Sequence, residues 1–506
     1  MLPPPAQGSM SAPPAGTART SRASLDKALM KGLAWTGAVK WVAQGLSWLS
    51  TLVVAHLLSP DDYGVAGATM LFVTLVQVLN EFGLGAAVVS RRDLTARQLA
   101  RLSTFSLMLG VVFFGVANLA APAVAAFYHK TDVVRVIRLL SLSFVVSGLV
   151  VVPRALLTKE LRYRDLAAIE ATESIVAIVV TLTLATLGFG YWSLAWGVLS
   201  GRMTSALITI AVKRPQFGAP GGFAEIRAPL SVGWHVVLGS LGWYIYRTAD
   251  ANLITNVLGT EAFGFYAMAL AMATLPLDRL NELVNRVTPG VFSSVQSDRA
   301  ELERYVRRGS QALSLLLFPV AVGLALVAGD MVPVVLGERW RPAIVPLQLL
   351  SLSAVVRALV PLLNQVLVST GNSRRSMWAT VAAALVMPVA FWFGTRSGTP
   401  GVAVMWVVLY PLVIIPLMML PALRAAGVGP RAYLHALRPA AEAALVMAVV
   451  VLLSRATWLE GFTPSLRLWV EVLLGMATYP AYLLMAHRSQ LTDYLGWFRS
   501  LRARAP

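Results

Sequence analysis

LSPDDYG at residues 58–64 and LGTEAFG at residues 258–264 are two copies of one short pattern. Each copy has a leucine, an acidic residue three positions later, and an aromatic residue followed by glycine at its end. Two further matches follow in the same order, at offsets of about 210 residues: LLSLS at 139–143 and 349–353, and the pairs Gly190/Trp196 and Gly401/Trp406. Matches that keep their order and sidedness predict a parallel duplication of about six helices.

The composition indicates that the chain lies mostly in lipid. Of its 506 residues 57% are hydrophobic and 13% charged, and its mean hydropathy is +0.69. Charged residues make up roughly a quarter of a soluble domain, and a helix needs about 20 apolar residues to cross a bilayer. We therefore expect an all-α polytopic membrane protein of about 14 transmembrane helices. The apolar stretches lie at about 33–58, 63–90, 98–123, 132–157, 165–187, 190–212, 229–258, 262–288, 309–329, 343–370, 377–395, 400–423, 436–454 and 465–487.

Basic residues alternate between the loops, and this alternation predicts the topology. One side of the predicted spans holds most of the 42 lysines and arginines, whereas turns on the other side, such as 59–62, 188–190 and 259–261, hold almost none. Because basic residues favour cytoplasmic loops, we expect a multi-pass protein of a bacterial inner membrane with both termini in the cytoplasm. The net charge of +18 is then mainly a topology signal, and no nucleic-acid partner is expected.

We expect five segments along the chain. They are a disordered cytoplasmic tail at 1–30, a first six-helix lobe at 31–214, a second at 215–430, two appended helices at 431–488, and a cytoplasmic tail at 489–506. Two lobes related by a parallel repeat are typical of transporters, which bind their substrate between the lobes and move one lobe against the other. The sequence therefore predicts a transporter and not an enzyme.

Metal and thiol chemistry is not expected. The chain has no cysteine, which excludes disulfides and Cys-based metal or redox sites. Its five histidines are scattered without the spacing of metal ligands. No paired carboxylates or nucleophile–histidine arrangement appears in the sequence, so we expect no catalytic residue, no metal and no cofactor other than a coupling ion.

Basic residues inside the predicted spans are candidates for a binding site. A charge at the bilayer centre costs about 2.5–3.5 kcal/mol, so each needs a partner or a water-filled cavity. We select as substrate-binding residues Arg202, Arg247, Arg357, Lys40 and Arg279. Lys40 and Arg279 could instead extend to the cytoplasmic interface, and the other three could form structural ion pairs. Because guanidinium groups suit phosphate, a cationic cavity favours an anionic passenger such as a pyrophosphate.

Acidic residues inside the spans are candidates for coupling transport to an ion. We select Asp250, Glu81 and Glu173, with H+ and Na+ both open as the coupling ion. Arg247 and Asp250 are three residues apart and share a helix face, so they could pair with each other or with a ligand in the cavity.

Several longer stretches match one known family in the same order over about residues 30–430. They include LLSPDDYGVAG at 57–67, EFGLGAAVVSRRDLT at 81–95, LGFGYWSLAWG at 187–197, YRTADANLITNVLGTEAFGFYAMA at 246–269, LPLDRL at 275–280 and VVLGERW at 334–340. In these stretches the chain resembles the Wzx-type polysaccharide flippases. These belong to the superfamily that also contains the MATE drug exporters and the peptidoglycan lipid flippases.

The resemblance implies a function and a set of partners. It implies that the protein translocates undecaprenyl-pyrophosphate-linked oligosaccharide units across the inner membrane by alternating access, for exopolysaccharide, capsule or O-antigen assembly. The partners implied are this lipid-linked oligosaccharide and membrane lipid, with a polymerase and export machinery of the same pathway as further candidates. Arg247, Asp250, Glu81 and Arg279 lie in matching segments. The selection of Lys40, Arg202 and Arg357 rests only on the energetic cost of a charge inside the membrane.

Two other functions stay open. A MATE-like ion-coupled small-molecule exporter would share the duplication, but we would expect an acidic and not a basic cavity. An integral-membrane glycan polymerase or ligase would carry catalytic residues in a large outer loop, whereas the longest outer segment predicted, at about 330–342, is short.

Overall fold

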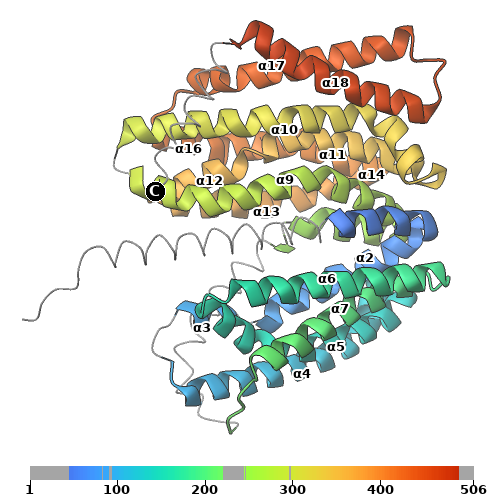
Figure 1. Ribbon diagram of the computed structural model, residues 1–506, viewed down its shortest axis with the longest axis vertical. Helices are drawn as coiled ribbons and strands as arrows, with labels where there is room; N and C mark the ends of the chain where they lie inside the picture. The colour runs from blue at the N-terminus through green and yellow to red at the C-terminus, as the bar shows by residue number, and fades with distance from the viewer. Residues whose placement is uncertain are drawn as a thin grey trace, which may run out of the picture.

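The computed structural model describes residues 45–81, 84–90, 94–219, 244–245, 247–295 and 298–488. Every regular element within these ranges is a helix, and the long helices run roughly side by side in stacked groups (Figure 1). The predicted all-α membrane architecture is thereby confirmed.

The first half of the chain forms a bundle with short connections. It contains the helix Gly45–Leu57, α2 (Pro60–Glu81), α3 (Leu84–Ser90), α4 (Ala96–Phe127), α5 (Asp132–Lys159), α6 (Tyr163–Thr186) and α7 (Tyr191–Val212). Local sequence sets several boundaries. Thr95 caps α4 with a hydroxyl that accepts from the backbone N–H of Gln98, and Gly188 and Gly190, both with positive φ, form the turn between α6 and α7. Apolar side chains of α2, α4, α5 and α7 pack into one core.

The second half forms the larger bundle above it in Figure 1. It contains a helix at 247–258, α9 (Thr260–Val295), α10 (Arg299–Val335), η1 (Glu338–Ala343), α11 (Ile344–Arg357), α12 (Val360–Ser369), α13 (Ser373–Gly394), η2 (Thr395–Ser397), α14 (Gly398–Val407), α15 (Leu409–Ile414), η3 (Ile415–Met419) and α16 (Leu420–Ala425). Its core includes Trp340, Tyr266 and Phe391, which are among the largest fully buried side chains of the described chain.

Two stretches of the second half are broken part way along. α11 ends at Arg357, and Pro361 in the first turn of α12 has no N–H to donate to the carbonyl of Arg357. The stretch from α14 to α16 is interrupted at Val408 and winds as a π-helix over Ile415–Met419, which contains Pro416. Broken helices near the middle of a membrane are typical of transporter binding sites.

The last two helices, α17 (Pro430–Thr457) and α18 (Pro464–Ala486), form a hairpin that packs against α10. Ion pairs join the hairpin internally and to α10. Arg455 on α17 donates to both carboxylate oxygens of Glu471 on α18, at 2.8 and 2.7 Å, and Nε of Arg467 on α18 donates to Asp330 on α10 at 2.7 Å. Both carboxylates are buried, so each needs its arginine partner to stay charged without a large penalty.

The number of spans is settled only in part. Within the described residues, eleven helical stretches are long and apolar enough to cross a membrane. One of them, 373–425, has 53 residues and at about 1.5 Å per residue exceeds twice the bilayer core. It turns back at Gly398, whose φ is +71°, and so corresponds to two predicted spans. The predicted total of fourteen is not confirmed, since the predicted spans 33–58 and 229–258 lie partly outside the described residues.

Successive helices alternate in direction, so their connections fall at two ends of the molecule. We call one the turn end, with the connections at 58–59, 128–131, 187–190, 259 and 336–343. We call the other the basic end, with connections at 160–162, 213–219, 370–372 and 426–429 that are flanked by lysine and arginine. By the charge rule these ends are predicted to face the periplasm and the cytoplasm respectively.

Candidate functional site

A cavity of about 870 Å³ lies inside the second half of the molecule, and we call it the charged cavity. Its walls come from the 247–258 helix, α9, the end of α11, α12, α13 and the broken stretch from α14 to α16. Among the described residues that line it, Leu71 of α2 is the one contributed by the first half. The cavity reaches from the middle of the helices toward the basic end, where the exposed residue Asp278 lines it.

Asp250 is the most deeply buried charge of this cavity, with 1% of its surface exposed. Oδ2 of its carboxylate accepts from the hydroxyl of Tyr266 on α9 at 2.7 Å and from Nε1 of Trp406 on α14 at 2.9 Å. Its Oδ1 accepts from the backbone N–H of Ala251 at 2.8 Å. One carboxylate therefore links three helices, and removing it would leave two buried donors without their acceptor.

Arg357 lies next to this group at the break between α11 and α12. Its guanidinium carbon is 4.6 Å from the centre of the Trp406 ring, a cation–π distance. One terminal nitrogen, Nη1, is buried and has no hydrogen-bond partner among the described residues. A buried N–H of a charged group is costly to leave unpaired, so this guanidinium has a donor that the described residues do not use.

Arg247 also lines the charged cavity, one turn before Asp250 on the same helix, with an exposed side chain. The structure thus brings together three of the predicted residues, Arg247, Asp250 and Arg357. With Asp278, the described lining carries two positive and two negative side chains. The predicted cationic character of the cavity therefore stays a prediction, as do the roles of these residues.

Arg202 and Glu173 lie elsewhere, within the first bundle. Nη1 of Arg202 on α7 donates to the hydroxyl of Ser143 on α5 at 3.0 Å. Glu173 on α6 lies 3.8 Å from the guanidinium of Arg154 on α5. Neither is among the residues that line the charged cavity. The structure therefore does not bring these two together with Arg247 and Arg357.

The remaining predicted residues cannot be placed in the site. Lys40 lies outside the described residues. Glu81 is the last residue of α2 and Arg279 belongs to α9, but the positions of both side chains also lie outside what the structure describes.

Two functional candidates were missed by sequence reasoning, Tyr266 and Trp406, which hold Asp250 and support Arg357. Trp406 carried one usable signal, because it is the repeated tryptophan of the second half. Its counterpart Trp196 is 43% exposed, whereas Trp406 is 4% exposed. Tyr266 gave no signal, since an aromatic residue in an apolar helix is usually core.

The two halves touch at the turn end through their duplicated motifs. A Cβ atom on Gly64 would lie 1.7 Å from the carbonyl oxygen of Thr260, and one on Gly264 would lie 1.9 Å from the carbonyl oxygen of Pro60. Gly64 corresponds to Gly264 in the repeat, and Pro60 to Thr260. The contact is therefore reciprocal, as across a two-fold axis, and only glycine allows the backbones to approach so closely.

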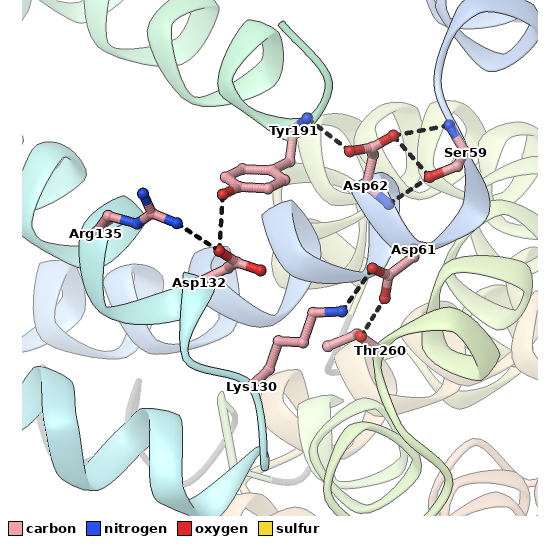
Figure 2. A network of polar contacts seen from close by, with 8 residues as sticks. All are labelled: Ser59, Asp61, Asp62, Lys130, Asp132, Arg135, Tyr191 and Thr260. Atoms are coloured by element: carbon pink, nitrogen blue, oxygen red, sulfur yellow. Dashed lines mark hydrogen bonds and ion pairs between the residues drawn. The ribbon is translucent and has the colours of Figure 1, made fainter.

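A polar network surrounds this contact, as Figure 2 shows. Asp61 lies between the halves: its carboxylate accepts from Nζ of Lys130 at 2.7 Å and from the hydroxyl of Thr260. The bond with Asp61 raises the pKa of Lys130 above its ordinary value. Beside it, Asp62 accepts from the backbone N–H of Tyr191 at 2.9 Å. The turn end is thus closed by packed glycines and hydrogen bonds.

These features define a class of protein: a multi-pass helical membrane protein with duplicated halves and an internal charged cavity. The same fold occurs in the solved structure of the lipid II flippase MurJ in an inward closed conformation. That structure matches with a TM-score of 0.74 and 14% sequence identity, covering 90% of this chain and 100% of that one.

The chain belongs to a family described as "Polysaccharide biosynthesis protein", which matches residues 53–345. It is 25% identical to the lipopolysaccharide biosynthesis protein WzxC of Escherichia coli K12, over 66% of this chain and 68% of that protein. It is 23% identical to the succinoglycan biosynthesis transport protein ExoT of Rhizobium meliloti, over 95% of this chain and 97% of that one. The predicted family is confirmed.

Proposed function

We propose that this protein is a flippase for undecaprenyl-pyrophosphate-linked oligosaccharide units. It moves them from the cytoplasmic to the periplasmic leaflet of a bacterial inner membrane, for exopolysaccharide, capsule or O-antigen assembly. The observation that carries the proposal is the charged cavity, which is lined by Arg357, a residue whose Nη1 is buried and has no hydrogen-bond partner among the described residues. The family and the saccharide pathways of the relatives support the passenger class, and the flippase fold supports a lipid-linked passenger.

The chemistry of the cavity suits a phosphate group. A guanidinium presents several N–H donors in one plane, and charge-assisted hydrogen bonds to phosphate are stronger than neutral ones. The Trp406 ring and the Asp250 carboxylate behind it fix the position of Arg357, so less side-chain freedom is lost on binding. Arg247 adds a second positive group at the same cavity.

Translocation follows from the arrangement of the halves. The charged cavity extends toward the basic end, while Gly64 and Gly264 close the turn end. With the basic end in the cytoplasm, the passenger enters from the inner leaflet. Rocking of the halves then separates the glycine contact and exposes the cavity to the periplasm. The termini lie in the cytoplasm, and a polymerase of the same pathway receives the product.

Asp250 is our candidate for coupling to H+ or Na+. It is a buried carboxylate next to the anion-binding arginine, so a change in its charge alters how strongly Trp406 and Arg357 are held. No cofactor is proposed beyond this ion.

Replacing Arg357 tests the function. In cells without the native protein, Arg357→Ala should lower polymer export by about tenfold or more, because one charge-assisted hydrogen bond is worth about 1.5–3 kcal/mol. Arg357→Lys keeps the charge but loses the planar donors, and should fall between Arg357→Ala and the native protein. Export is measured together with the lipid-linked saccharide that accumulates on the cytoplasmic side.

Arg304→Ala is the matched control. Arg304 also lies over an aromatic ring of the second half, 5.7 Å from the Tyr305 ring centre, but it is outside the charged cavity. It should leave export within about twofold. Normal export by Arg357→Ala at equal protein level would remove Arg357 from the site and contradict the proposal.

A further inference from the structure

A second cavity, of about 760 Å³, lies between the two halves, and we call it the lateral cavity. Its described lining is uncharged and comes from α2, the end of α4, the helix around residues 244–253 and α13. Four of its large apolar residues are about half exposed: Phe127, Ile245, Val389 and Trp392. Because these helices cross the membrane, the exposed side of the cavity faces hydrocarbon and not water.

The lateral cavity lies nearer the turn end than the charged cavity does. Its α4 residues come from the last two turns of that helix, before Tyr128. Its α13 residues, from Pro388 to Trp392, lie in the last third of α13. The charged cavity instead uses Thr380 and Ala383 of α13, toward the basic end. The two cavities are therefore offset along the membrane normal and overlap at the level of Thr248.

One helix separates them and presents a different stripe of side chains to each. Ile245, Ala249 and Asn252 line the lateral cavity, whereas Arg247, Asp250 and Ala251 line the charged cavity. This spacing of three and four residues places each set on its own helix face. Thr248 lines both cavities.

Leu71 of α2 also lines both cavities and marks their border from the other side. The hydroxyl of Tyr244 donates to the Leu71 carbonyl, which ties the two halves together at this border. A charged compartment and an uncharged, lipid-facing compartment thus meet at two residues.

We propose that the lateral cavity binds the hydrocarbon chain of the passenger while its anionic part occupies the charged cavity. This rests on the proposed function. A passenger with one anionic end and one apolar end needs adjoining polar and apolar compartments, and charges in the apolar one would be costly. The lateral cavity keeps the chain in contact with the bilayer while the polar part moves, so the chain never enters water.

Another apolar cavity, of about 420 Å³, lies between α10 and the α17–α18 hairpin. None of its described lining residues lines the charged cavity, and Glu471 is one of its lining residues. A chain bound there would have no shared wall with the anionic group bound by Arg357. The lateral cavity is therefore the better match to one amphiphilic molecule.

Binding to the full-length protein in nanodiscs tests the proposal with two probes, inorganic pyrophosphate and farnesyl pyrophosphate. Ala123→Trp fills the lateral cavity from α4 and should weaken farnesyl pyrophosphate binding by about tenfold while pyrophosphate binding is unchanged. Ala126→Trp is the matched control, because Ala126 is an exposed alanine of the same helix that does not line the cavity. It should change neither affinity.

A farnesyl pyrophosphate with a diazirine on its chain provides a test on the unmodified sequence. Photolysis should attach it to the end of α4 and to 388–392 of α13. Attachment to α10 and the hairpin, or the same labelling pattern from a diazirine phospholipid, would overturn the proposal. So would an unchanged farnesyl affinity in Ala123→Trp. If the native protein binds neither probe better than Arg357→Ala does, the proposed function itself has failed.

Discussion

The two halves of this molecule share a scaffold and differ in the chemistry placed on it. The repeat offsets of about 200 and 210 residues give first-half counterparts for three residues that line the charged cavity and for Tyr266, which donates to Asp250. Asp250 corresponds to Ser50, Tyr266 to Ala66, Arg357 to Ser147 and Trp406 to Trp196. In the first half, the positions of these four residues are thus occupied by two serines, an alanine and a partly exposed tryptophan.

The contact between the halves, in contrast, keeps the symmetry of the repeat. Gly64 and Gly264 each approach a backbone carbonyl of the other half, and the two approaches are nearly equivalent. Symmetry is therefore kept where the halves pack against each other, and lost at the charged cavity, which we propose as the binding site. We infer that duplication supplied the movable frame and that one copy acquired the binding groups.

The largest effect is expected at the glycine contact. Gly64→Ala and Gly264→Ala should each lower export by roughly ten- to a hundredfold, because a methyl group would overlap a backbone oxygen that has little room to shift. Gly115→Ala is the control, since a Cβ at that position on α4 would have no described neighbour within 4 Å beyond the backbone of its own helix. Export is compared at equal amounts of membrane-inserted protein. A large loss of export in only one of the two glycine variants would contradict the symmetry of the contact.

An effect on stability, and not on export, separates Asp250 from its counterpart Ser50. Asp250→Ala leaves the Tyr266 hydroxyl and the Trp406 N–H without their acceptor, at about 1–3 kcal/mol for each buried group. Asp250→Asn keeps an acceptor oxygen and should be less destabilising. Ser50→Ala should cost less than about 1 kcal/mol. Thermal unfolding of the purified protein followed by tryptophan fluorescence measures all three, and equal losses at both positions would contradict the asymmetry.

The fold was largely predictable from the sequence, because hydropathy, loop charge and the repeat report directly on spans and their order. The helix breaks also have local causes, such as Pro361 and Pro416. The packing of Trp406 against Arg357 was not predictable in this way. It depends on how α14 lies against α11, which no local pattern records.

From the sequence, the candidate site was predictable only as a set of residues whose charge is costly inside the membrane. Intramembrane position showed that Arg202, Arg247 and Arg357 each need a partner or a cavity. It did not show which of these arginines has a bonded partner and which lines a cavity. Arg202 bonds to Ser143 within the first bundle, and Glu173 lies near Arg154, whereas Arg247 and Arg357 line a cavity. These outcomes are set by contacts between helices far apart in sequence.

The smallest effect is expected at the turn-end network, which belongs mainly to the first half. Lys130→Gln removes a partly exposed ion pair with Asp61 and should cost less than about 1 kcal/mol. The raised pKa of Lys130 means that its stabilisation is present below the ordinary lysine pKa and is lost only as pH rises through the raised one. The unfolding difference between Lys130→Gln and the native protein should therefore stay constant between about pH 6 and 9. A difference that disappears by pH 8 would show that the pair does not act in this way.

The central claim is that the anion site lies in the second half alone, and pyrophosphate binding to purified full-length protein tests it most directly. Arg357→Ala and Arg202→Ala remove one deep arginine from each half. We expect Arg357→Ala to weaken binding by about tenfold or more and Arg202→Ala to change it by less than about twofold. Equal weakening by both variants, or weakening by Arg202→Ala alone, would contradict the account.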